Sequence, residues 1–177
     1  DLLHETIYAD LLIIDSHETL THYVEKQPTR FIRDLLSDVQ CPVLLVPHSY
    51  KPFDKIVLLY DGEPSSVYAI RMFSYLFPLF KNLETEVVSV KTPTQTLHLP
   101  DNKLMKEFMK RHFPKLDYSV IKGFADVDIV KHLKSLGPNV LVVLGAYRRG
   151  RVSRWLHESM ADTLVKETKL PLFIPHH

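Results

Sequence analysis

Short runs of apolar, often β-branched residues alternate with longer segments in which apolar residues recur at helical spacing. The short runs predict strands at residues 55–60, 86–90, 117–121, 140–144 and 171–174. The segments between them predict four helices. Strands that alternate with helices in this way are typical of a parallel sheet with right-handed crossovers. We therefore expect residues 51–177 to form an α/β, Rossmann-like open sheet of five parallel strands, with helices on both faces.

Proline, glycine and acidic residues mark where these helices begin and end. Pro64 begins the first helix and Pro78 bends or ends it, because proline is tolerated only in a first helical turn. Asp126 is the expected cap of the third helix, and Gly137 with the following proline ends it. In the second helix the residues expected to face inward are Leu104, Met105, Phe108 and Phe113.

Residues 1–50 carry a shorter version of the same pattern. The expected elements are the end of a helix at 1–8, an apolar strand at 9–14, a helix at about 28–39 and a strand at 42–46. ADLLIID parallels NVLVVLG, and CPVLLVPH parallels LPLFIPHH, with an offset of about 130 residues in both places. Such an offset indicates a duplicated domain. We interpret residues 1–50 as the last third of a first domain and 51–177 as a complete second one.

The stretch 139–162 carries the strongest candidate chemistry. A buried strand ends at Gly145, a basic loop follows, and Ser159 with Asp162 forms a capping box for the next helix. In an open α/β sheet, a loop at the carboxyl end of a strand that faces a helix N-terminus is where phosphates bind. Asp61 lies at the carboxyl end of the first strand, at the same edge of the sheet.

This stretch resembles the signature of the universal stress protein family. In its nucleotide-binding members the fourth strand is followed by Gly, two residues, Gly, nine residues, then Gly and Ser or Thr. Gly145 takes the first glycine position and Ser159 the hydroxyl position, while Arg148 and Glu158 replace the other two glycines. The resemblance implies the strand order 3-2-1-4-5 and an acidic residue, here Asp61, near adenine and ribose. The motif is therefore expected to be degenerate, because the side chains of Arg148 and Glu158 obstruct the close backbone approach that glycine permits.

Several candidates have an ordinary structural alternative. The alternative role of Asp61 is to hydrogen-bond the backbone of a turn, and that of Ser159 is to cap a helix. The arginines of the loop could clamp a phosphate, contact a macromolecule, or simply be solvated. The candidate residues of the ATP crevice are Asp61, Gly62, Val90, Gly145, Arg148, Arg149 and Ser159.

The composition of the chain argues against several classes of partner and binding site. The chain has 22 basic and 21 acidic side chains, so its net charge favours neither nucleic acid nor an anionic membrane. No apolar run approaches the roughly 20 residues that span a bilayer. The single Cys41 excludes an internal disulfide, and the histidines lack metal-site spacing. We expect no metal, no membrane or nucleic-acid partner, and a cytoplasmic location.

These observations favour a regulatory or interaction module of the stress response over an enzyme. No nucleophile elbow, Walker loop or paired-carboxylate site occurs in the sequence. The expectation is no bound cofactor, and the alternative is a protein that binds ATP or AMP. The resemblance also implies association through the fifth strands, within the chain or in a homodimer, with 42–46 antiparallel to 171–174. A further protein partner is expected, but the sequence does not identify it.

Overall fold

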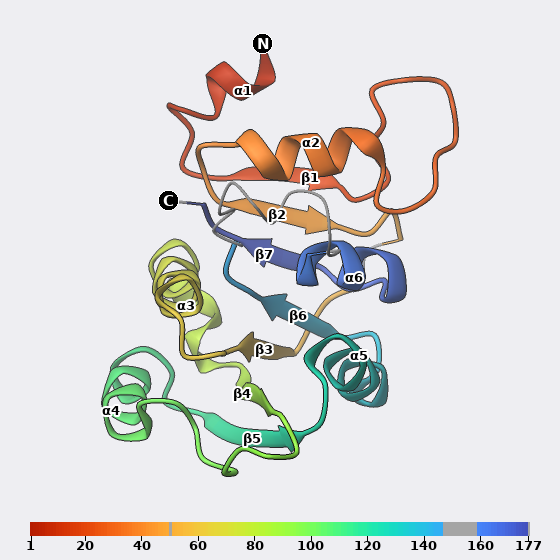
Figure 1. Ribbon diagram of the computed structural model, residues 1–177. Coiled ribbons are helices and arrows are strands. Elements are labelled where there is room, and N and C mark those ends of the chain that lie inside the picture. The colour runs from red at the N-terminus through yellow and green to blue at the C-terminus, as the bar shows by residue number, and fades with distance from the viewer. Residues whose placement is uncertain (50, 147–158, 177) are drawn as a thin grey trace.

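The computed structural model describes residues 1–49, 51–146 and 159–176. Within these residues seven strands form one sheet in the order β1-β2-β7-β6-β3-β4-β5 (Figure 1). The strands are β1 Leu12–Asp15, β2 Val43–Val46, β3 Lys55–Leu59, β4 Glu84–Lys91, β5 Leu116–Lys122, β6 Val140–Val143 and β7 Leu172–Ile174. The helices are α1 Leu2–Glu5, α2 Arg30–Asp38, α3 Pro64–Leu76, α4 Asn102–His112, α5 Ala125–Leu136 and α6 Met160–Glu167, with a 3-10 turn η1 at Pro78–Asn82.

The five C-terminal strands have the arrangement that the sequence predicted. Their spatial order is β5-β4-β3-β6-β7, which is 3-2-1-4-5 in chain order, and all four neighbouring pairs are parallel. The α/β fold and this strand order are therefore confirmed. β3 is central, because it pairs with β4 on one side and β6 on the other. The strand order reverses direction at this point.

Helices cover both faces of the sheet, as Figure 1 shows for α3 and α4 on one side and α5 and α6 on the other. α3 and α4 enclose an aromatic-rich core of Phe73, Phe113 and Phe173 against the strands. α2, α5 and α6 pack on the opposite face, over aliphatic residues such as Val57, Val142 and Leu172. Alternate residues of each strand enter the two cores, because successive side chains of a strand point to opposite faces.

The helices agree with the predictions except at two residues, Asp126 and Leu104. α3 begins at Pro64 and ends before Pro78, and Gly137 ends α5 with a φ of +88°. Asp126, however, lies in the first turn of α5, whose cap position is Phe124, so that assignment was wrong. Leu104 was also expected inside but is 67% exposed.

The N-terminal segment completes the sheet through β1 and β2. These strands are parallel, α2 connects them, and β2 pairs antiparallel with β7 through Val43–Ile174, Leu44–Phe173 and Leu45–Leu172. The predicted antiparallel pairing of 42–46 with 171–174 is thus confirmed within one chain. The predicted strand at 9–14 begins later, at Leu12. Duplication of a domain and association between chains stay predictions.

None of the described helices is long and apolar enough to cross a membrane. The longest, α3, ends after 13 residues and presents only one of its faces to the core.

Candidate functional site

A crevice of about 460 Å³ opens at the carboxyl ends of β3, β4 and β6. This is the point where the strand order reverses, which is the usual ligand position in open α/β sheets. The helices α3 and α6 lie on opposite faces of the sheet, and side chains from both helices, from α5 and from the strands surround the opening. The lining residues are Leu59, Tyr60, Asp61, Glu63, Pro64, Ser65, Ser66, Val88, Val90, Ala125, Ile129, Leu144, Gly145 and Met160.

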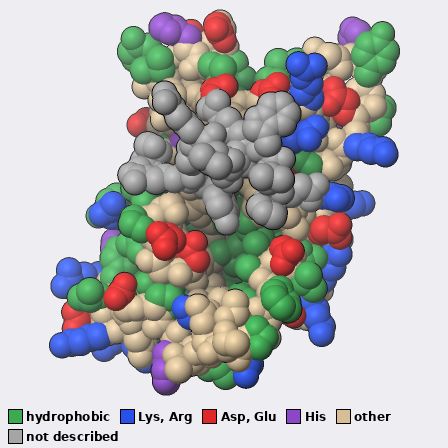
Figure 2. Space-filling view, in the orientation of Figure 1, with side chains coloured by type: hydrophobic (Ala, Val, Ile, Leu, Met, Phe, Trp, Pro, Cys, Tyr) green, Lys and Arg blue, Asp and Glu red, His purple; other side chains and the backbone are tan. Residues whose placement is uncertain are grey.

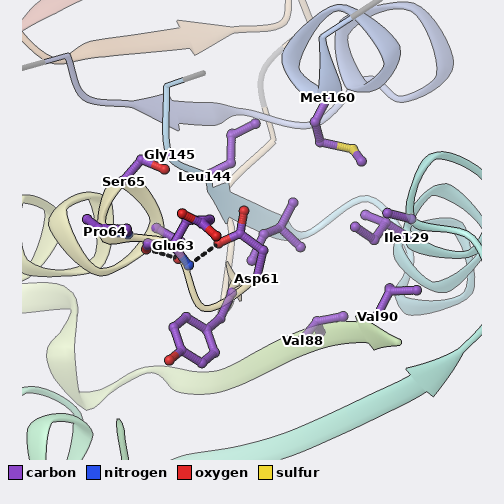
Figure 3. A pocket seen from close by; sticks show the side chains of 14 residues that line it. Asp61, Glu63, Pro64, Ser65, Val88, Val90, Ile129, Leu144, Gly145 and Met160 are labelled. Atoms are coloured by element: carbon purple, nitrogen blue, oxygen red, sulfur yellow. Dashed lines mark hydrogen bonds between the residues drawn. The ribbon is translucent and has the colours of Figure 1, made fainter. Parts of the chain in front are cut away.

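The walls of the crevice are apolar, and one end is acidic. In Figure 3, Val88 and Val90 of β4 form one wall, and Ile129 of α5 and Met160 of α6 point in from the side opposite α3. Asp61 and Glu63 lie at the other end, beside α3. Figure 2 shows hydrophobic side chains gathered in a central hollow with acidic side chains on either side. An apolar slot with a few polar groups at its rim is the usual form of a small-molecule site.

Asp61 stabilises the turn after β3, which was one of the two roles predicted for this residue. Its Oδ1 accepts a hydrogen bond from the backbone N–H of Glu63 at 2.9 Å. Gly62, between them, has a φ of +96°, and a Cβ there would lie 2.6 Å from Cβ of Pro100. Gly62 is therefore needed by the turn and does not itself line the crevice. Asp61 both shapes the turn and borders the crevice.

Gly145 allows β6 and α3 to approach closely. A Cβ at this position would lie 2.7 Å from the carbonyl carbon of Ser65 and 2.9 Å from the nitrogen of Ser66. Both atoms belong to the backbone at the start of α3, so they cannot move aside as a flexible side chain could. The glycine predicted to face a phosphate thus has a packing role of its own, and it also lines the crevice.

Ser159 caps α6 as the sequence predicted. Its Oγ accepts from the N–H of Asp162 at 3.1 Å, and the Asp162 carboxylate accepts from the N–H of Ser159 at 3.2 Å. The capping box is confirmed. Ser159 lines a smaller neighbouring pocket together with Gly145. Arg148 and Arg149, the other two candidates, lie outside the described residues.

The structure thus brings Asp61, Val90 and Gly145 into one crevice. The sequence reasoning did not single out Val88, Ile129, Leu144 or Met160, which supply most of the apolar wall. The positions of Val88 and Leu144 could have been found from the strand order, since the ends of the second and fourth strands flank the first, whereas Ile129 and Met160 are on helices. Apolar residues there had been interpreted only as core.

A buried ionic network lies on the same face of the sheet, towards the amino ends of the strands. Glu86 is 5% exposed, and its carboxylate lies 2.9 Å from Nζ of Lys55 and 3.0 Å from Nε2 of His132. Ser119 donates its hydroxyl to the same carboxylate at 2.5 Å. Burial alone raises the pKa of Glu86, but Ser119, Lys55 and His132 together hold this pKa below its ordinary value of 4.5.

This network joins β3, β4, β5 and α5 beside the crevice wall. Ser119 and His132 both contact the same Glu86 oxygen, Oε1, so they do not form a nucleophile–base pair. Glu86 precedes Val88 by two residues and therefore shares its face of β4. His132 is on α5, three residues after Ile129. The network fixes α5 beside the crevice that Ile129 lines.

The carboxyl end of β1 has different chemistry from that of β6. Asp15 stands where Gly145 stands in the other segment, and it accepts hydrogen bonds from the N–H of His17 at 2.8 Å and from Nδ1 of His48 at 3.0 Å. Burial raises the pKa of Asp15, but the contacts with His17 and His48 outweigh this effect and hold the pKa below its ordinary value. Among the described residues, no group of His, Cys, Asp and Glu side chains has a geometry that could hold a metal ion.

Comparison with protein-family models and with curated proteins returns no match, but solved structures do match. A universal stress protein from Archaeoglobus fulgidus DSM 4304 has a TM-score of 0.69 at 14% identity, over 98% of this chain and 63% of its own. The fold is that of the universal stress proteins. A putative universal stress protein from Pseudomonas aeruginosa UCBPP-PA14 has a TM-score of 0.65 at 17% identity, over 98% of this chain and 66% of its own.

Smaller proteins of the universal stress fold match only part of this chain. A universal stress protein in complex with cAMP has a TM-score of 0.57 at 14% identity and covers 71% of this chain and 98% of its own length. The chain therefore exceeds the length of that protein, but it spans less than two thirds of the Archaeoglobus protein. Identities at this level establish the universal stress fold alone.

Proposed function

We propose that this protein is a ligand-responsive regulatory module with a universal stress fold, and that its crevice binds the nucleoside part of an adenine nucleotide. The observation that carries the proposal is the apolar slot at the strand-order reversal, with the Asp61 carboxylate at its rim. Its volume of about 460 Å³ lies within the range of small-molecule sites. The module is not an enzyme, and its location is cytoplasmic.

The chemistry of the crevice suits a flat ring attached to a sugar. Val88 and Val90 face Ile129 and Met160 across the slot, so a planar base would be removed from water on both faces. A ribose hydroxyl is a donor, and a carboxylate such as Asp61 is the acceptor that nucleotide folds commonly place near it. A structurally similar protein was solved with cAMP, an adenine nucleotide. This likeness supports the choice of ligand class.

In this proposal the protein binds the phosphates more weakly than the nucleoside. Arg148 and Glu158 replace two glycines of the resembling motif, which removes close backbone approach to a polyphosphate. Gly145 and Ser159 also have packing and capping roles. We therefore expect adenosine and AMP to bind, and ATP to gain little from its further phosphates.

A second candidate is an interaction module that binds no nucleotide. This candidate is favoured because Gly145 has a packing role and Ser159 a capping role, and neither role needs a ligand. In this case residues 1–50 are the last third of a first domain copy, and the function lies in association with an unidentified protein. Ligand binding decides between the two candidates.

Thermal unfolding with adenosine, AMP and Mg-ATP tests the proposal. A ligand at about 100 times its dissociation constant adds about 2.7 kcal/mol of stability. For a chain of this size that corresponds to about 5–11 °C in the unfolding midpoint. Val90→Phe would fill the slot and should abolish the adenosine shift. Val127→Phe, on the exposed side of α5, is the matched control and should retain the shift.

No midpoint shift with millimolar adenosine or AMP in the unmodified protein would overturn nucleoside binding and favour the interaction module. An adenosine shift that survives Val90→Phe would place the ligand elsewhere.

A further inference from the structure

The outer surface of α3 and α4 combines exposed arginines with exposed apolar side chains. Both helices cover the same face of the sheet (Figure 1). Two contacts join their C-terminal turns: Oγ of Ser74 lies 2.8 Å from Nδ1 of His112, and the ring centres of Tyr75 and His112 are 5.8 Å apart. None of these three residues lines the crevice or the smaller pocket beside it, so this surface is separate from the candidate nucleoside site.

Each of the two helices places an arginine in line with an apolar or aromatic side chain. Tyr75 follows Arg71 by four residues on α3, and Arg111 follows Leu104 by seven on α4, so the members of each pair share one side of their helix. Both arginines are exposed, Tyr75 is 63% exposed and Leu104 is 67% exposed. These four residues are named the α3–α4 surface. Single exposed apolar residues are ordinary, so their combination with cations is the informative feature.

The two arginines of this surface have no carboxylate partner in the described part of the chain. The ion pairs that lysines and arginines form there are Lys55–Glu86, Arg30–Asp34 and Lys134–Glu167. Glu107 lies one turn before Arg111 but does not pair with it, and it is the single acidic residue of α4. The other charged residues of α4 are the cations Lys103, Lys106 and Lys110. The surface therefore carries an excess of positive charge.

The positive charges of the two helices act on the same point. Burial lowers the pKa of His112, and the charges of Arg111 and Arg71 lower it further. Cations in the last turn of a helix also stabilise its dipole, which explains Lys110 and Arg111 without any partner. The dipole does not explain Arg71, which is five residues from the end of α3, or the exposure of Leu104 in the first turn of α4.

We propose that the α3–α4 surface binds an acidic segment of another protein, whose carboxylates pair with Arg71 and Arg111 and whose apolar side chains cover Tyr75 and Leu104. Charge complementarity determines the choice of partner, because the unpaired cations attract acidic segments and repel basic ones. Guanidinium groups pair with carboxylates through two parallel hydrogen bonds. Arginine and tyrosine are also the residues that most often dominate the binding energy of protein interfaces. The inference does not depend on nucleoside binding.

Two other anionic partners fit the surface less well. A helix that lies on a membrane inserts its apolar side among the lipids, but the apolar side of α4 is packed in the core through Met105 and Met109. Nucleic acid binds through contacts of cations with phosphates and through stacking of bases on aromatic rings. Neither interaction uses Leu104, whereas an apolar side chain of a protein segment would cover it.

Fluorescence anisotropy of a labelled synthetic peptide with repeated Glu-Glu-Leu units tests the proposal on the 177-residue chain. The protein should bind this peptide more tightly than the matched Gln-Gln-Leu and Glu-Glu-Ser peptides. Arg71→Gln and Arg111→Gln should each weaken binding by about twofold to fivefold, as for solvent-exposed ion pairs, and by about tenfold together. Leu104→Ser should weaken it by about tenfold if about 50 Å² of apolar surface is no longer removed from water.

Arg33→Gln is the matched control, because it removes the same charge from an exposed position of α2, on the opposite face of the sheet. This variant should bind the peptide as the unmodified protein does. Unfolding curves of every variant verify that the fold is retained. Adenosine titration of the double arginine variant should be unchanged, so failure of this proposal leaves the proposed nucleoside site intact.

Absence of binding, or equal binding of either comparison peptide, would overturn the proposal. Binding that survives the double substitution of Arg71 and Arg111 would do so as well. Oligothymidylate and phosphatidylserine vesicles test the other two classes of partner. If either binds more tightly than the Glu-Glu-Leu peptide and loses its affinity in the double variant, the surface belongs to nucleic acid or to a membrane and the protein-segment proposal is wrong.

Discussion

Replacing Glu86 with Gln tests whether the buried ionic network stabilises this fold. The substitution preserves the shape of the side chain and removes its charge, so Lys55 and His132 lose their carboxylate partner. Ser119 can still donate to the amide oxygen. Glu84→Gln is the matched control, because Glu84 lies on the same strand and is exposed.

The contacts give the expected size of the effect. Two unit charges 2.9 Å apart attract by roughly 6 kcal/mol at an effective dielectric constant near 20, and desolvation offsets most of this attraction. Removing one partner of a fully buried pair costs about 3–5 kcal/mol. The side chains of Lys55 and His132 are 27% and 22% exposed, so water can partly replace the carboxylate. We therefore expect Glu86→Gln to lower the free energy of unfolding by about 2–3 kcal/mol.

The assay is urea unfolding of both variants and the unmodified protein at several pH values. Because the pKa of Glu86 is lowered on folding, its ionised form contributes stability above pH 4.5 that is lost as the pH falls below this value. The gap between the unmodified protein and Glu86→Gln should be constant near neutral pH and shrink below about pH 4.5. The role of the network would be refuted if Glu86→Gln lowered the free energy of unfolding no more than Glu84→Gln does. It would also be refuted if the loss stayed the same as the pH falls below 4.5.

Three further predictions concern packing. Gly145→Ala should lower the free energy of unfolding by about 1–3 kcal/mol, because its Cβ meets the backbone of Ser65; an unfolding midpoint equal to that of the unmodified protein would contradict this close approach. Leu45→Ala should cost about 2–5 kcal/mol in urea unfolding, since Leu45 is buried in the β2–β7 seam, whereas Ile13→Ala, at a position 59% exposed, should cost little. Cys41, whose thiol pKa burial raises, should react with a thiol reagent only as fast as the protein opens; rapid modification under native conditions would show an accessible thiol.

The strands and their order could be predicted because their residues carry strong local signals. β6 is a continuous run of Val and Leu between breakers, and Ser159 with Asp162 gives both halves of a capping box within four positions. Leu104 was misplaced for the opposite reason. Several positions of α4 are apolar, and Met105 and Met109 were enough to cover its inner face, so Leu104 faces solvent.

The candidate site was predictable only in part, because its walls come from elements distant in sequence. Asp61 and Gly145 follow strands, so their place at the crevice could be inferred from the chain alone. Ile129 gave no such signal, because it is one apolar residue on an amphipathic helix and had been interpreted only as core. Glu86 did give a signal, an acidic residue directly before the apolar run of β4, but its partners lie on three other elements.

The antiparallel seam between β2 and β7 also bears on how the chain is made. Leu45 leaves the ribosome long before its register partner Leu172, because strands β3 to β6 lie between them in the chain. Contacts between such distant segments form late, because loop closure must precede any gain from the contact. During synthesis β2 has an unpaired apolar edge, which is a hazard for aggregation. We therefore expect nascent chains that end before β7 to depend on chaperones far more than full-length chains do.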